Sequence, residues 1–595
     1  MKRSLKIACT LMVTLAMGSV ITGAPPKPRD EDFTIRIVHT NDMHSRFDET
    51  SRLSTACSPQ DSENKKCYGG FARIATLVRQ ARKSTTPSLF LNAGDTYQGT
   101  IWYNIYKWQV VARLLNILAP SAISLGNHEF DDGVKGLVPF INNASFPVLT
   151  CNLDLSKEPT LANTKLANST VLMVKGKKIG VIGYLTPETK IVSMAGEVNF
   201  KDEVECIREE AKRLKASGVE ILIALGHSGF ETDQRIAREV EDIDLVIGGH
   251  TNTFLYTGKQ PDVEVPEGLY PFEVTQPSGR KTYVVQAYAY TKYLGNFEVG
   301  FDDKGEVTRI QGNPILVDGS VEQAKDVLEV LDEMRSKLKN DTETIVGKTH
   351  VLIDGDSKSC RRQECNMGNL ITDAIIDYNA NQYVIKDGWT DAPIALQNSG
   401  SIRASITRNN KDMITKADVL GTLPFGNIVY KVKMTGKQLL EVLEWGVRSL
   451  DLASTANLNG AFLQVSGLQV VYDTTKPTNS RVVSVQVQCA NCTIPSYSPL
   501  NITKIYTVLL NDFMHNGGDG YQMLKNLNGT SLAIETAEVL VEYLKKYSPV
   551  HPGVEWRIRY QNAPNVLYDD TTHSNSGYNV KPMWMVLLLP LILLL

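Results

Sequence analysis

The sequence has no excess of charge of either sign. Its 62 lysines and arginines nearly balance 65 aspartates and glutamates, so the 595-residue chain carries a net charge of −3. A nucleic-acid partner usually needs a basic face, and this balance gives no support to one. The composition, 42% hydrophobic and 21% charged, is that of a globular protein. The length predicts two large domains rather than one.

The chain also lacks, at its closing end, an apolar run long enough to span a membrane. The last segment, "MWMVLLLPLILLL", has 13 residues and no basic flank after it; a spanning helix needs about 20. Small residues and a short polar spacer precede it, which is the pattern of a GPI-attachment signal with the lipid on Ser574, Asn575 or Ser576. A tail anchor or a frayed hydrophobic end is the alternative. We expect residues 575–595 to be removed, and residues 1–24 to be a cleaved secretory signal peptide.

Cysteine is scarce, and Cys9 of the nine lies in the predicted signal peptide. Three pairs of the other eight are close in sequence: Cys57 with Cys67, Cys360 with Cys365, and Cys489 with Cys492. An oxidising compartment favours pairing as disulfides, although sequence alone does not fix the connectivity. A zinc ribbon made from the last two pairs is disfavoured because the spacing between them is far too long.

Six glycosylation sequons also fit a secreted surface. They begin at Asn143, Asn168, Asn340, Asn491, Asn501 and Asn528. With the two ends of the chain, they predict a protein on the extracellular face of the plasma membrane, GPI-anchored, with a soluble secreted form as a variant.

Five apolar segments each end in side chains that can bind metal. The first, "IRIVHTNDMHSR" from Ile35, delivers Asp42 and His44. The later segments deliver Asp95, then Asn127, His128 and Asp131, then His227, and finally His250 and Asn252. Helix-like segments separate them, which predicts a layered α/β domain with a site at the strand ends.

Each of these residues has a structural alternative. Asp, Asn and Gly after a strand are usually turn residues, and a lone buried histidine is more often a core residue than a ligand. The shared position of several histidines favours the ligand interpretation. Four of the nine stand at such strand ends: His44, His128, His227 and His250. His39, inside the first strand, we interpret as structural.

The residue types suit one chemistry. Carboxylate, imidazole and amide oxygen, without thiolate, favour two divalent ions, with zinc expected and manganese or cobalt as alternatives. Two ions about 3.5–4 Å apart need a bridging carboxylate, for which Asp95 is the candidate. The terminal ligands would be Asp42, His44 and Asn252 on one ion, and Asn127, His227 and His250 on the other. His128 would stabilise charge on phosphoryl oxygens, with Asp131 orienting its ring.

The motifs at the strand ends carry a family resemblance. "HTNDMHSR", "NAGDTYQGT", "GNHEFD", "GHSG" and "GGHTNT" resemble, in this order, those of the calcineurin-like dinuclear metallophosphoesterases. "CRRQECNMGNL", "LPFGN" and "NGGDGYQM" are similar to the second domain of the 5′-nucleotidase/apyrase family, so the resemblance covers nearly the whole mature chain. With the GPI-type tail, the similarity is closest to the GPI-anchored ecto-5′-nucleotidases.

The resemblance implies an α/β fold in three parts. It places a four-layer α/β/β/α metallophosphoesterase domain over residues 30–322, a linker helix over 323–344 and an α/β nucleotide-binding domain over 345–562. Periodicity predicts the helix at 323–344 but allows it equally to be a core helix of either domain. The family resemblance favours the linker.

Beyond residue 345 no histidine stands in a metal-binding pattern. The resemblance instead implies a nucleoside pocket, in which Phe425 and Phe513 would sandwich the base because aromatic faces favour offset stacking. Taken singly, such residues are usually core or turn residues. The polar members of the predicted pocket are Arg361 and Arg403 for ribose and phosphate, Asn398 for the base edge, and Asp519 for the ribose hydroxyls.

The activity that the resemblance implies is extracellular hydrolysis of nucleoside 5′-monophosphates, above all AMP, by a two-metal-activated water. An apyrase acting on ATP and ADP is the alternative, and the GPI-type tail favours the first. An inactive binding or adhesion protein is a remote alternative, because ligands stand at every strand end. The resemblance also implies a homodimer. Cys151 and Cys206 are extra relative to the vertebrate pattern, and we expect them to pair.

Overall fold

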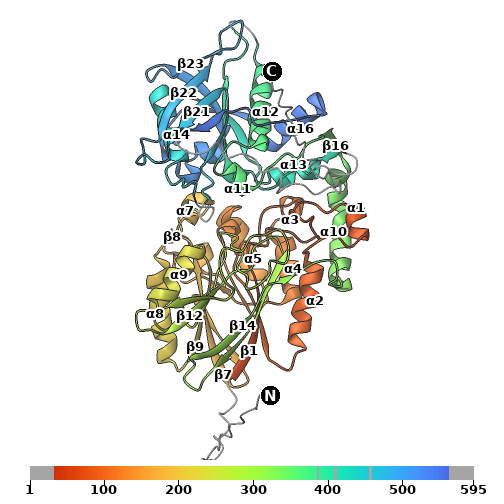
Figure 1. The fold of residues 1–595 in the computed structure, drawn as a ribbon, viewed down its shortest axis with the longest axis vertical. Helices are drawn as coiled ribbons and strands as arrows, with labels where there is room; N and C mark the ends of the chain where they lie inside the picture. The colour runs from red at the N-terminus through yellow and green to blue at the C-terminus, as the bar shows by residue number, and fades with distance from the viewer. Residues whose placement is uncertain (1–32, 385–387, 408–411, 454–457, 562–595) are drawn as a thin grey trace, which may run out of the picture.

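The computed structural model describes residues 33–384, 388–407, 412–453 and 458–561. The predicted signal peptide, the lipidation residues and the tail lie outside these ranges. Figure 1 shows two halves stacked along the long axis, the first coloured red to yellow-green and the second green to blue.

The first half contains two stacked sheets. One has the order β14-β13-β1-β2-β3-β4 with β15 paired to β13, and the other has the order β11-β12-β10-β9-β7-β6. The strands are β1 Phe33–Thr40, β2 Ser88–Asn92, β3 Ala122–Ser124, β4 Val148–Leu149, β6 Ser169–Val174, β7 Lys177–Leu185, β9 Ile221–His227, β10 Leu245–Ile247, β11 Phe272–Thr275, β12 Lys281–Val285, β13 Tyr293–Phe301, β14 Val307–Gly312 and β15 Ile315–Leu316. A separate pair joins β5 (Leu153–Asp154) to β8 (Asn199–Phe200).

Successive side chains of a strand face opposite sides of its sheet, so each sheet packs against the other sheet on one side and against helices on the other. In β2, Leu89 and Leu91 pack into the core between the two sheets, while Phe90 faces the helices on the other side. The helices of this half are α1 Pro59–Glu63, α2 Phe71–Arg82, α3 Ile101–Tyr106, α4 Trp108–Leu118, α5 Gly133–Asn143, α6 Pro159–Ala162, α7 Thr189–Val192, α8 Glu203–Ala216 and α9 Phe230–Glu239, with η1 at Asn127–Phe130. Helices α2, α4 and α5 cover the first sheet, and α8 and α9 cover the second. The predicted four-layer α/β/β/α order is confirmed.

The helices form where apolar residues recur at helical spacing. Phe71, Ile74, Ala75 and Val78 of α2 follow the i, i+3, i+4, i+7 pattern and are all buried. In α8 the Asp202 side chain accepts from Glu205 N and caps the first turn. Both helices match the helix-like segments expected from the sequence.

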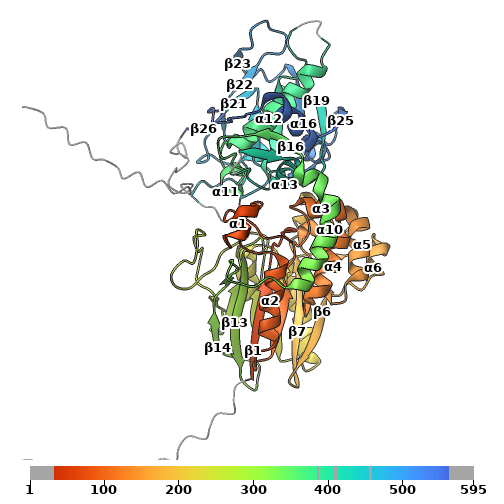
Figure 2. The same cartoon turned by 90° about the vertical axis from the view of Figure 1, so that its right-hand side faces the viewer.

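Helix α10, Lys325–Glu343, runs along the side of the molecule between the two halves (Figure 2). Its apolar stripe of Val327, Leu331, Met334 and Leu338 packs into the core shared with α2 and α4. Leu420, in helix α13 (Lys416–Thr422) of the second half, packs against the same core. The helix is therefore packed on the first half and reaches the second.

The second half is built on a five-stranded sheet, β20-β17-β24-β19-β25, and a four-stranded sheet, β23-β22-β21-β26, with β16 and β18 as a separate pair. The strands are β16 Ile345–Lys348, β17 Ile394–Asn398, β18 Met413–Thr415, β19 Ile428–Thr435, β20 Leu463–Ser466, β21 Leu468–Tyr472, β22 Val482–Gln488, β23 Tyr497–Pro499, β24 Ile505–Asn511, β25 Gly529–Glu535 and β26 Ile558–Tyr560. The helices are α11 Ser357–Cys360, α12 Asn366–Gln382, α13 Lys416–Thr422, α14 Gly436–Gly446, α15 Asp512–His515 and α16 Thr536–Tyr547, with η2 Ser399–Ser401, η3 Gly518–Gly520 and η4 Gln522–Leu524.

The structure joins the cysteines in four disulfides: Cys57–Cys67, Cys151–Cys206, Cys360–Cys365 and Cys489–Cys492. All six predicted glycosylation asparagines are exposed, so each can be reached from solvent. Within the described ranges, no helix combines the length and the apolar character that crossing a membrane requires.

Candidate active site

The predicted metal ligands of the first half stand directly after strands of both sheets. Asp42 and His44 follow β1, Asp95 follows β2, and Asn127 opens η1 after β3. From the second sheet, His227 ends β9, and His250 and Asn252 follow β10. Parallel pairing of β1, β2 and β3, and of β9 and β10, brings these ends to one edge of the stacked sheets.

The backbone at these positions is unusual. Five of the seven predicted ligands have positive φ although none is glycine: Asp42, His44, Asp95, His250 and Asn252. Left-handed backbone is uncommon for such residues and clusters at functional sites. Gly249 passes so close that a Cβ there would lie 2.8 Å from His227 Nδ1 and 3.0 Å from Asp42 Oδ2. The loops are therefore shaped around the cluster.

Asp95 lies at the centre of the cluster. Its Oδ2 is 2.9 Å from His227 Nε2, 3.9 Å from His44 Nε2 and 3.9 Å from His128 Nε2. Two groups of possible metal ligands share it, one with His44 and His128 and the other with His227 and His250. This is the position that a bridging carboxylate occupies.

Asp42 and Asn127 tie the remaining ligands to this centre. Asp42 Oδ1 lies 3.7 Å from His227 Nε2 and 3.8 Å from His44 Nε2, and its carboxylate accepts from His250 N. His250 Nδ1 is 2.9 Å from Asn127 Oδ1. Asn252 Oδ1 is buried and has no hydrogen-bond partner among the described residues. These contacts link six of the seven predicted ligands, and the seventh, Asn252, donates to the hydroxyl of Tyr290, whose ring lies 5.6 Å from that of His44.

The donor set fits divalent metal ions. Separations of 3.7–3.9 Å between imidazole nitrogens and carboxylate oxygens exceed a hydrogen bond. They match two ligands that share an ion at about 2.0–2.2 Å from each. The Asn252 side-chain oxygen, which accepts no hydrogen bond from the described residues, is a further possible metal ligand. Two divalent ions are therefore the cofactors that this site is built to hold.

The pKa values of the cluster also indicate a cation site. Burial raises the pKa of Asp42 to about 6, against the opposing effect of His227. Burial would also raise the pKa of Asp95, but His227 and His128 hold it well below its usual range. Burial would lower the pKa of His227, yet Asp95 and Asp42 raise it to about 10. The carboxylates thus favour positive charge at the centre of the cluster, and a bound cation would supply that charge.

His128 and Asp131 form a pair beside the cluster. His128 Nδ1 lies 2.6 Å from Asp131 Oδ2, and Ser193 donates to the other oxygen of the same carboxylate. Burial opposes protonation of His128, but Asp131 and Asp95 raise its pKa. The carboxylate therefore fixes a ring whose Nε2 faces the site and favours its charged form.

Sequence reasoning missed Glu129, which stands inside the "GNHEFD" motif. Its buried carboxylate accepts four backbone N–H groups, from Gly126 at 2.6 Å, Asp95 at 2.9 Å, Thr96 at 2.8 Å and Tyr97 at 3.0 Å. Four charge-assisted hydrogen bonds lock the loop that carries the central carboxylate. Its place between two predicted site residues was the available signal.

Side chains of the second half reach into this cluster. Arg403 Nη2 lies 3.4 Å from His44 Nε2, and the Phe425 ring stacks on His128 with centroids 5.9 Å apart. Arg403 also lies over the Phe425 ring. Burial lowers the pKa of Arg361 to about 10, and the like charge of Arg403 adds to the effect. Two guanidinium groups repelling each other beside a metal cluster form a receptor for an anion.

Comparison with known proteins also divides the chain into two parts. Residues 35–254 match the calcineurin-like phosphoesterase family, and residues 345–526 match the 5′-nucleotidase C-terminal domain. The chain is 42% identical to a 5′-nucleotidase of Mus musculus, over 92% of this chain and 94% of that one. It belongs to the 5′-nucleotidase family. The chain is also 46% identical to Protein 5NUC of Lutzomyia longipalpis, over 89% of this chain and 93% of that one.

A solved structure shows the same fold. The 5′-nucleotidase precursor from Thermus thermophilus superposes with a TM-score of 0.81 at 35% identity, over 89% of this chain and all of that one. Membership identifies the chain as a metal-dependent phosphoesterase, and the calcineurin-like half implies two divalent ions. The predictions of family, fold class and enzyme class are confirmed.

The remaining pocket residues of this 5′-nucleotidase-family chain form a buried amide network. Asn398 Nδ2 donates to Asp519 Oδ2 at 2.7 Å, and Asn398 Oδ1 accepts from Asn511 Nδ2 at 2.8 Å. Asp519 has φ of 51°, and its carbonyl accepts from Trp445 Nε1. Asn398, predicted to face the base, therefore donates one N–H to Asp519 while its oxygen is held by Asn511.

Asn511 is the second residue that sequence reasoning missed. It ends β24, caps α15 by accepting from Met514 N, and is buried. The local sequence "LNDFMH" shows the cap signal but not the contact with Asn398, which lies 113 positions away. The ring of Phe513, in α15, lies against Gly518, where a Cβ would come within 2.5 Å of it.

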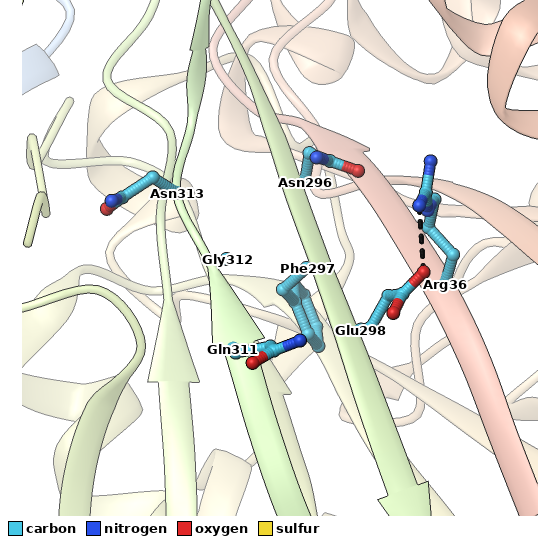
Figure 3. A pocket seen from close by; sticks show the side chains of 7 residues that line it. All are labelled: Arg36, Asn296, Phe297, Glu298, Gln311, Gly312 and Asn313. Carbon is cyan, nitrogen blue, oxygen red and sulfur yellow. Dashed lines mark hydrogen bonds and ion pairs between the residues drawn. The ribbon is translucent and has the colours of Figure 1, made fainter.

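Two cavities differ in their relation to the site. One of about 160 Å³ opens beside Arg361 and is lined also by Gly446, Leu450, Asn459 and Phe462. The other, about 460 Å³, lies over β1, β13 and β14 and holds the Arg36–Glu298 ion pair (Figure 3). None of the predicted site residues lines the second cavity, which we assign no part in the reaction.

Proposed function

We propose that the chain hydrolyses nucleoside 5′-monophosphates, above all AMP, to a nucleoside and phosphate. The observation that carries the proposal is the meeting of Arg403 with His44 and of Phe425 with His128, 3.4 Å and 5.9 Å apart. It places groups suited to phosphate and base against the metal cluster. A nucleoside 5′-monophosphate carries both of the groups that these side chains suit, a phosphate for the metal cluster and a base for the aromatic ring.

The residues divide the work as follows. When bound, two divalent ions supply polarisation of the phosphoryl group and activation of a water molecule. Arg361 and Arg403 bind the phosphate and ribose oxygens. His128, held by Asp131, donates a hydrogen bond from Nε2 to an oxygen on which charge develops. Asp519 accepts from the ribose hydroxyls, and Phe425 and Phe513 hold the base.

Nucleotide entry requires the two halves to move apart. Arg403 and Phe425 of the second half contact His44 and His128 of the first half, so a bound nucleotide would lie between the halves. We infer that rotation between the halves opens the pocket and closes it again over the substrate.

Substrate choice is tested by measuring phosphate release from AMP, ADP and ATP separately. We expect AMP to be the preferred substrate, with adenosine as the second product. Release of phosphate from ATP and ADP but not from AMP would establish the apyrase alternative. No release from any of the three by metal-loaded protein would leave the inactive binding protein.

The metal identity and the setting in the cell are proposals of the same kind. Imidazole, carboxylate and amide donors favour zinc, which metal analysis of the purified protein checks. Phosphatidylinositol-specific phospholipase C should release active enzyme from expressing cells if the GPI anchor is present. Light scattering on the released protein would show whether it is the homodimer that the family resemblance implies.

A further inference from the structure

Two histidines of the second half meet outside the catalytic cluster. His350 Nδ1 and His551 Nε2 lie 2.9 Å apart, although 201 positions separate the residues. The His350 side chain is 51% exposed, and His551 is exposed as well. Because both rings reach water, neither needs the other to satisfy a buried polar atom. The contact is a ring-to-ring hydrogen bond, and an ion bound by both nitrogens would hold the rings at the same separation.

The backbone holds the two rings together. Val550 N donates to Lys348 O at 2.9 Å, and Thr349 forms a parallel bridge with Val550. On the other side, Thr349 N donates to Asp412 O at 2.9 Å. Three chain segments therefore place His350, Asp412 and His551 side by side before any side chain interacts.

We propose that His350 and His551 form a peripheral site for one divalent transition-metal ion of the zinc, copper and nickel group. Two nitrogens bound at about 2.0–2.1 Å lie about 2.9 Å apart when they subtend a right angle at the ion, and about 3.4 Å apart at the tetrahedral angle. The observed separation of 2.9 Å matches the first arrangement. Square-planar and tetragonal sites of Cu²⁺ and Ni²⁺ have that angle, and a small ring movement suits Zn²⁺.

The Asp412 carboxylate lies near the His350 ring nitrogen that does not contact His551. Its Oδ2 lies 4.0 Å from His350 Nε2, the ring nitrogen that faces away from His551. A carboxylate on the far nitrogen, directly or through one water, fixes the tautomer and orientation of a ligating imidazole. Water molecules would fill the other positions, because both rings are exposed.

The ion would join two distant parts of the chain. His350 follows β16, the first strand of the second half, and His551 precedes β26, which pairs with β21 in the four-stranded sheet. A metal bridge would hold the segment before β26 against β16. The site contains none of the residues assigned to catalysis, so it is independent of the proposed activity.

Metal content provides the first test. We expect the zinc-loaded mature protein, dialysed against micromolar Zn²⁺, to hold one equivalent more than either His350→Ala or His551→Ala. Both variants should hydrolyse AMP as the wild type does. His515→Gln, a histidine of the same half outside the pair, should keep the extra equivalent. Asp412→Asn should weaken binding of that ion about tenfold.

Copper gives a signature of the ligands themselves. Cu²⁺ added below one equivalent should displace Zn²⁺ from the pair, because it binds imidazole more tightly, and should give an electron paramagnetic resonance spectrum with coupling to two nitrogens. The His350→Ala/His551→Ala double variant should lose that spectrum. The same zinc content in the wild type and both single variants, or an unchanged copper spectrum in the double variant, would overturn the proposal.

Discussion

The two halves of the molecule face each other with different kinds of side chain. The first offers buried titratable groups, with the imidazoles of His44, His128 and His227 within 4 Å of the Asp95 carboxylate. The second offers guanidinium groups, amides and half-buried rings such as Phe425. Groups that bind metal and move protons are thus separated from groups that recognise shape and charge. Under the proposed function, chemistry and substrate selection therefore belong to separate cores.

Backbone conformation follows the same division. Positive φ occurs at five of the seven predicted metal ligands but only at Asp519 among the six predicted pocket residues. Metal ligands must converge on a point, which forces loops into uncommon conformations. A base and a ribose are bound by surfaces, which ordinary strand ends and helix starts can supply. The first region should therefore tolerate substitution less than the second.

Replacing the central carboxylate should have the largest effect. Asp95→Ala removes the side chain that both metal groups share, so both ions and nearly all hydrolysis of AMP should be lost. Metal analysis and phosphate release measure the two losses. Asp132→Asn, a carboxylate nearby that accepts from Tyr103 and Lys107, is the matched control. Full metal content in Asp95→Ala would contradict its bridging role.

His128→Ala should come next, lowering kcat about 10²–10⁴-fold while both ions stay bound. AMP and a small aryl phosphate should be affected alike, because the imidazole acts at the phosphoryl group. Steady-state kinetics measures the change in kcat, and metal analysis of the same preparation measures the number of bound ions. Loss of one ion would instead show that His128 is a ligand, which its distance of 3.9 Å from Asp95 allows.

A smaller and selective effect is expected from Asn511. Asn511→Ala removes the amide that orients Asn398 and, through it, Asp519. A lost hydrogen bond of about 1.4 kcal/mol would raise KM about tenfold. AMP and ribose 5-phosphate should both show it, whereas an aryl phosphate, which has no ribose, should not. The exposed Asn516→Ala is the control, and equal effects on all three substrates would indicate general damage to the second half.

The aromatic rings should give the smallest change. Phe425→Ala and Phe513→Ala should raise KM for AMP about 2–12-fold, the equivalent of about 0.5–1.5 kcal/mol of stacking. Ribose 5-phosphate lacks a base and should be hydrolysed as before by both variants. If Phe425→Ala also slows ribose 5-phosphate hydrolysis, its stacking on His128, rather than on a base, is what matters.

The outcome for the sequence-based predictions depends on how local each signal was. "GNHEFD" and "GGHTNT" combine a strand end with a ligand in a few residues, so the positions of Asn127, His128 and His250 could be predicted directly. The helix at 323–344 was also local, and α10 begins and ends within one or two residues of the expectation. Side-chain pairing was not local, which is why the role of Asn398 in orienting Asp519 could not be predicted.

The residues that end the strands follow from the sequence alone, because alternating apolar residues followed by polar ones specify a strand and its exit within a few positions. Only the tertiary structure decided which of them meet. Asp95 and His227 come from different sheets, and Arg403 reaches His44 from the other half of the chain. His350 and His551 are adjacent only because strand pairing at Thr349 and Val550 closes a span of 201 positions. Such contacts depend on how sheets stack and register, which no stretch of sequence contains.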